Sequence, residues 1–108
     1  MVELYLIVHP KCFNNWDIDG TLGEKKKKLE ELMRENVYLI IDEEFSEFGE
    51  EIHLDMPPPH KDLRVTIIGA YYKSKTTRNW CLDNQFETLK DRGYNVEINK
   101  QLSLPDIT

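Results

Sequence analysis

Residues 2–10 read Val-Glu-Leu-Tyr-Leu-Ile-Val-His-Pro, and they are the strongest indication of the fold. From Val2 to Val8 the run is mostly apolar and includes β-branched side chains, and Pro10 bounds it. A run of this length without strict alternation of apolar and polar residues is typical of a strand buried on both faces. The stretch therefore predicts a strand in a parallel sheet, with His9 at its carboxyl end.

Two similar apolar runs follow, at 37–41, which ends at Asp42, and at 63–68, which Gly69 closes. Two segments rich in helix-forming residues, 24–36 and 79–92, place their apolar side chains on one face. In chain order we expect strand 2–8, loop 11–23, helix 24–36, buried strand 37–41, a short helix within 43–56, strand 63–68, polar connection 71–77, helix 79–92 closed by Gly93, edge strand 94–98 and tail 101–108.

Alternation of strands and helices predicts an α/β fold with right-handed crossovers. We expect a single α/β domain over residues 1–108, a three-layer sandwich of Rossmann-like or flavodoxin-like type with about four parallel strands in the order 2-1-3-4. In such sheets the ligand crevice lies beyond the carboxyl ends of the strands. This rule nominates His9, Asp42, Gly69 and the start of helix 79–92.

Composition excludes several functional classes. The chain of 108 residues has a formal net charge of −6, which argues against general binding of nucleic acids. No apolar run is long enough for a membrane span, and the amino terminus lacks a basic region, so we expect a cytoplasmic protein without a secretory signal. The sequence has no glycine-rich phosphate loop, and the His9–Cys12 pair lacks further zinc ligands, so we expect neither a cofactor nor a metal.

Asp17-Ile18-Asp19-Gly20-Thr21 matches the motif that opens the active site of haloacid dehalogenase-like phosphatases. In that chemistry the first aspartate ends a buried strand and attacks phosphorus beside a metal ion. Here the preceding strand ends much earlier, at His9. A turn rich in Asp and Asn that leads into a helix explains the stretch better, and the phosphatase is only a third hypothesis.

Cys81 falls in the first turn of helix 79–92, with Asn79 as a candidate N-cap. The positive end of a helix dipole lowers the pKa of a thiol, and Lys73 and other nearby basic residues act in the same direction. If the third strand lies beside the first, Cys81 comes close to His9. Cysteine and histidine together form a minimal pair of nucleophile and base, although a cysteine in a helix is commonly only a small buried apolar residue.

Residues 81–96, Cys-Leu-Asp-Asn-Gln-Phe-Glu-Thr-Leu-Lys-Asp-Arg-Gly-Tyr-Asn-Val, resemble the stretch around the catalytic cysteine of isochorismatase-like hydrolases. The opening Leu-Ile-Val-His-Pro at 6–10, Phe13 and Gly-Thr-Leu at 20–22 are similar to that family's amino-terminal region. The resemblance implies a Cys-dependent hydrolase of a small amide or related carbonyl compound. His9 occupies the position of the family's catalytic aspartate, and Lys61 and Lys73 are candidates for its lysine.

The resemblance leaves two hypotheses open. In the first, Cys81 and His9 are catalytic, and Asp42, Tyr71 and Lys73 bind a small-molecule ligand near the carboxyl ends of the strands. In the second, the chain is a non-catalytic α/β module that binds a partner or forms a homodimer, and Cys81 belongs to the core. Tyr71, expected beyond the third strand, suits either a pocket or a dimer interface.

Overall fold

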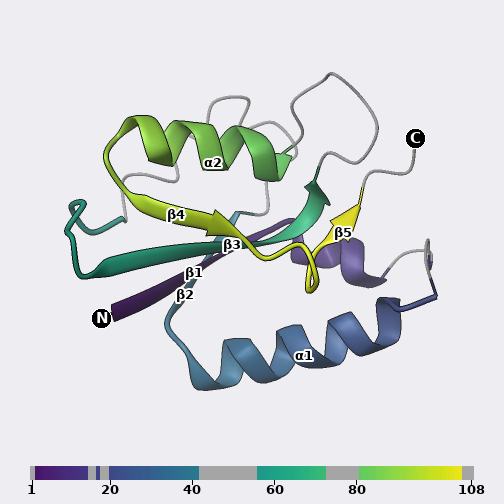
Figure 1. The fold of residues 1–108 in the computed structure, drawn as a ribbon. Helices are drawn as coiled ribbons and strands as arrows, with labels where there is room; N and C mark the ends of the chain where they lie inside the picture. Colours follow the sequence, from purple (N-terminus) through teal and green to yellow (C-terminus); the bar gives the residue numbers. More distant parts are fainter. Residues whose placement is uncertain (1, 15–16, 18–19, 42–55, 73–80, 106–108) are drawn as a thin grey trace.

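The structure of the protein, a computed structural model, describes residues 2–14, 17, 20–41, 56–72 and 81–105 (Figure 1). Its elements, in chain order, are β1 (Val2–Val8), the 3-10 helix η1 (Pro10–Asn14), α1 (Leu22–Glu35), β2 (Tyr38–Ile41), β3 (Leu63–Tyr72), α2 (Cys81–Asp91), β4 (Asn95–Ile98) and β5 (Leu104–Pro105). The expected short helix within 43–56 lies almost entirely outside the described residues. None of the helices in the described ranges is long and apolar enough to cross a membrane.

The sheet has the order β2-β1-β3-β4, and all of its strand pairs are parallel. This confirms the predicted fold class and strand order. The longest register joins β1 to β3, from Val2 opposite Leu63 to Val8 opposite Gly69. These two strands therefore form the centre of the sheet and bring their carboxyl ends to the same edge.

The two long helices cover opposite faces of the sheet, which gives three layers (Figure 1). On one face, Leu82 and Leu89 of α2 pack in a buried cluster with Leu6 and Val8. On the other face, α1 contributes Leu22 and Leu29 to a cluster around central-strand residues. The apolar residues of β1 thus divide between two cores, as expected for a strand buried on both faces.

The expectation that 37–41 is a strand buried on both faces is wrong. β2 lies at the edge of the sheet, and Val37, Tyr38 and Ile40 are 69%, 36% and 46% exposed. Leu39 packs against the core cluster beneath α2. An apolar run has the same composition at an edge as at the centre, so the run alone does not distinguish the two positions.

The strand expected to end at Ile68 continues through Gly69 to Tyr72. Gly69 has φ +146°, and a Cβ at this position would lie 1.9 Å from the carbonyl oxygen of Val8. Glycine is required because β1 approaches the backbone of β3 too closely for a side chain. Tyr71 is consequently part of β3, and the prediction that it lies in a connection beyond the strand is wrong.

The carboxyl-terminal segment, expected to be a tail, is part of the fold. β5 pairs with the end of β3, where Ala70 lies opposite Leu104. Ser103 is fully buried; its hydroxyl accepts a hydrogen bond from Gly69 N–H at 3.2 Å and donates one to the carbonyl oxygen of Asn99 at 2.6 Å. Lys25 of α1 donates to the carbonyl oxygen of Ser103 at 2.9 Å. The segment is therefore held by β3 and by α1.

Both long helices have recognisable ends. Asp17 Oδ1 accepts a hydrogen bond from the backbone N–H of Leu22, the first residue of α1, at 3.0 Å. At the end of α2, Gly93 has φ +94°, and Tyr94 N–H returns to the carbonyl oxygen of Leu89. A left-handed glycine with such a bond is a common C-terminal cap, so the predicted role of Gly93 is confirmed.

Substituting Gly69→Ala is expected to lower the free energy of unfolding by at least about 3 kcal/mol, because β1 and β3 must separate to admit the new methyl group. Gly23→Ala is the matched control, since Gly23 lies in α1 and a Cβ there meets no atom within 4 Å. That control should leave stability unchanged or raise it by up to about 1 kcal/mol. Urea unfolding monitored by circular dichroism measures both, and similar effects of the two substitutions would contradict the close approach at Gly69.

Candidate functional site

The carboxyl edge of the sheet is assembled by the ends of its three neighbouring strands. Val8 of β1 lies opposite Ile41 of β2 on one side and opposite Gly69 of β3 on the other. Parallel strands bring the segments that follow them to one edge, and open α/β sheets bind ligands there. Figure 1 shows that α2 begins near the carboxyl end of β3, so the backbone of its first residue, Cys81, lies on the side of this edge.

His9 is the first residue after β1, and it has an unusual backbone conformation. Its φ is +50°, and His9 is the non-glycine residue with positive φ among those the structure describes. Its carbonyl oxygen accepts a hydrogen bond from Cys12 N–H at 3.0 Å, which begins η1. Non-glycine residues in the left-handed region are uncommon and concentrate at functional sites and sharp turns. The imidazole is half-buried beside this turn.

Gln85 is a candidate site residue that sequence reasoning missed. It is 3% exposed, and its Oε1 atom has no hydrogen-bond partner among the residues that the structure describes. It follows Cys81 by four residues in α2, so the two residues lie on the same face of the helix, one turn apart. A buried amide oxygen without a donor is costly and calls for an explanation. The sequence does contain a signal for Gln85: it lies three residues after Leu82 and four before Leu89, so a polar side chain falls on the helix face of two residues that are buried.

The other predicted binding residues are only partly described. Asp42 and Lys73 lie outside the described residues, as does Asp19 of the phosphatase-like motif. For Tyr71 and Cys81 the structure describes the backbone: Tyr71 lies within β3, and Cys81 begins α2. The structure therefore brings His9 and the start of α2 to one edge of the sheet.

Asp17 has a structural role in the loop between β1 and α1. It is exposed, η1 separates it from β1, and its carboxylate caps the start of α1. This matches the predicted turn that leads into a helix. Within the described ranges, no group of three or more His, Cys, Asp or Glu residues is arranged to hold a metal ion.

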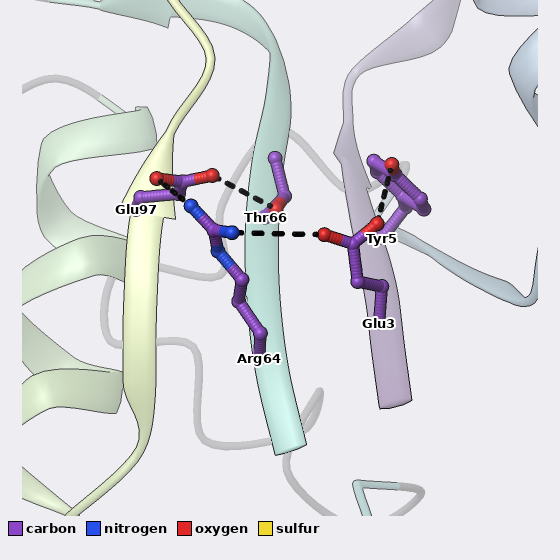
Figure 2. A network of polar contacts seen from close by, with 5 residues as sticks. All are labelled: Glu3, Tyr5, Arg64, Thr66 and Glu97. Carbon is purple, nitrogen blue, oxygen red and sulfur yellow. Dashed lines mark hydrogen bonds and ion pairs between the residues drawn. The ribbon is translucent and has the colours of Figure 1, made fainter. Parts of the chain in front are cut away.

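A second polar cluster lies on the opposite half of the sheet (Figure 2). It is on the face that carries α1, because Tyr5 packs against the core cluster to which α1 contributes. Arg64 of β3 forms an ion pair with Glu97 of β4 at 2.7 Å and a longer one with Glu3 of β1 at 3.8 Å. Tyr5 donates to Glu3 at 3.1 Å, and Thr66 donates to Glu97 at 3.5 Å. The cluster thus connects three adjacent strands through their side chains.

Charge and partial exposure define the role of this cluster. Glu97 and Glu3 both raise the pKa of Arg64, Glu97 more strongly, so the guanidinium stays charged. Burial raises the pKa of the Tyr5 hydroxyl, and the neighbouring Glu3 raises it further. The charged side chains are each between one third and one half exposed. Cross-strand pairs of this kind fix strand register, and they make this part of the sheet compatible with water.

Comparisons with known protein families, with curated proteins and with solved structures gave no match to this chain.

The raised pKa of Tyr5 predicts a pH dependence. The pKa of Tyr5 in the folded state lies above the ordinary value of 10.0. The free energy of unfolding therefore falls as the pH rises from that ordinary value through the folded-state pKa. Glu3→Gln should lower the Tyr5 pKa only part of the way, since burial remains, and Arg64→Gln should raise it, since the guanidinium favours the phenolate. NMR titration of ring-labelled tyrosine measures both shifts, and shifts of the same sign would contradict the arrangement in Figure 2.

Proposed function

We propose that the protein is a small cytoplasmic hydrolase, similar to isochorismatase-like enzymes, that cleaves a small amide or related carbonyl compound. Cys81 is the nucleophile, His9 is the base, and backbone N–H groups at the start of α2 stabilise the oxyanion. One observation carries the proposal: α2 begins at Cys81, on the side of the same sheet edge where His9 follows β1.

The start of α2 suits a nucleophilic thiol for a physical reason. The first N–H groups of a helix have no partner within the helix, and the helix dipole places partial positive charge beside them. Both effects favour a thiolate at Cys81 over a neutral thiol. Negative charge that develops on a substrate oxygen is stabilised by the same N–H groups.

The proposed reaction has two steps. First, His9 accepts the thiol proton, the Cys81 sulfur bonds to the carbonyl carbon, and the amine leaves with the proton that His9 returns. Second, water attacks the resulting thioester, which releases the acid and restores the thiol. Asp42, Tyr71 and Lys73 remain proposed binding residues, because each ends or follows a strand at this edge.

A second candidate function is a non-catalytic binding or dimerisation module. The observation that favours it is the exposed apolar surface of β2, which a monomeric enzyme does not need. The presence of His9 where the resemblance leads us to expect an aspartate points in the same direction.

The reactivity of Cys81 separates the two candidates. In a Cys12→Ser variant, iodoacetamide should modify Cys81 in the folded protein, with a rate midpoint below about pH 7.5 instead of the value of about 8.5 for an ordinary thiol. His9→Gln in that background should move the midpoint upward, because it removes the proposed base.

Cys81→Ser is the matched control, since it leaves only Cys12 to react. It should abolish the rapid reaction seen in the Cys12→Ser variant. A Cys81 thiol that stays unmodified until the protein unfolds would overturn the hydrolase and support the non-catalytic module.

A further inference from the structure

The outer edge of β2 carries an apolar surface that its own fold leaves exposed. Tyr38 and Ile40 are 36% and 46% exposed, and Val37, which precedes the strand, is 69% exposed. Tyr38 lies opposite Tyr5, and Ile40 lies opposite Ile7, so both side chains point to the face that α1 covers over β1. The cover provided by α1 therefore ends before it reaches this edge.

The backbone of β2 is paired on one side only within the part of the chain that the structure describes. There β2 pairs with β1, and no described strand bonds to the N–H and C=O groups on its outer side. Folded proteins usually protect such an edge with charged residues, proline or a bulge. Residues 37–41, Val-Tyr-Leu-Ile-Ile, contain no charge and no proline. An edge of this kind favours the addition of another strand.

A second copy of β2 fits this edge in antiparallel orientation. When Leu39 lies opposite Leu39 of the second copy, Tyr38 lies opposite Ile40 of that copy, and the pair occurs twice because of the twofold symmetry. Directly opposed residues in an antiparallel pair project from the same face, as Tyr38 and Ile40 do. Aromatic and β-branched side chains form favourable cross-strand pairs.

The charges of α1 select the same orientation. Its first half contains Lys25–Lys28 after one acidic residue, and its second half contains Glu30, Glu31 and Glu35 with one arginine. A twofold axis perpendicular to the sheet keeps both copies of α1 on one face and reverses their directions. The positive half of each helix then lies toward the negative half of the other, which gives the complementarity that orients partners during association.

We propose that the chain forms a twofold-symmetric dimer in which β2 pairs antiparallel with β2 of a second copy, centred on Leu39. The two sheets join into one continuous sheet, and Tyr38 and Ile40 become buried at the junction. The carboxyl edge that contains His9 and Cys81 stays in each copy separately, so this dimer does not depend on the proposed hydrolase activity.

Sedimentation velocity over a range of protein concentrations tests the proposal. The wild-type chain should show a reversible dimer, and Ile40→Lys should raise its dissociation constant at least about tenfold, because each interface would bury two lysines. Val2→Lys is the matched control: Val2 is 64% exposed but lies on β1, before the part of that strand that pairs with β2. That variant should dimerise like the wild type.

Hydrogen exchange measures the pairing directly. The amide groups of β2 should exchange more slowly as the concentration of wild-type protein rises, and this protection should be absent in Ile40→Lys at the same concentrations. A chain that is monomeric throughout the concentration range, a dimer that Ile40→Lys leaves intact, or a dimer whose β2 amides stay unprotected would each overturn the proposal. Circular dichroism confirms that both variants fold, so that a loss of dimer reports the interface.

Discussion

The close backbone approach of Val8 to Gly69 is the constraint on which the rest of the structure depends. A side chain at residue 69 would collide with the carbonyl oxygen of Val8, so glycine allows β1 and β3 to remain paired up to the end of β1. β3 then continues beyond β1 and pairs with β5, and the Gly69 N–H bonds to the buried hydroxyl of Ser103. Ser103 also accepts a hydrogen bond from Lys25 through its carbonyl oxygen. The residues around Gly69 thus connect the end of β1, the carboxyl-terminal segment and α1.

In the part of the chain that the structure describes, two parts of the α1 face have no helix above them, and their chemistry differs. Over β3 and β4 the side chains of Arg64 and Glu97 satisfy each other and tolerate water. Over β2 the exposed side chains are Tyr38 and Ile40, which gain nothing from water. The polar region stabilises the sheet by itself, whereas the apolar region gains stability from a partner.

Sequence patterns predicted the four strands of the β2-β1-β3-β4 sheet, their order and both long helices, because long apolar runs and helical spacing are strong local signals. They failed where an outcome depends on residues distant in the chain. Gly69 looked like the end of a strand because glycine usually interrupts strands, and its need to avoid Val8 is visible only in three dimensions. The segment around Leu104 is too short to show a period. The missing partner of Gln85 Oε1 likewise depends on the packing of α2 against the sheet.

The central functional claim is that His9 and Cys81 share one site at the carboxyl edge. The most direct measurement is an NMR spectrum of the histidine rings before and after alkylation of Cys81 in a Cys12→Ser variant. His60 is the internal reference, because it precedes β3 and lies at the opposite edge of the sheet. If the two residues share a site, the His9 ring signals shift on alkylation while those of His60 stay in place. Unchanged His9 signals after full modification of Cys81 in the folded protein would contradict it.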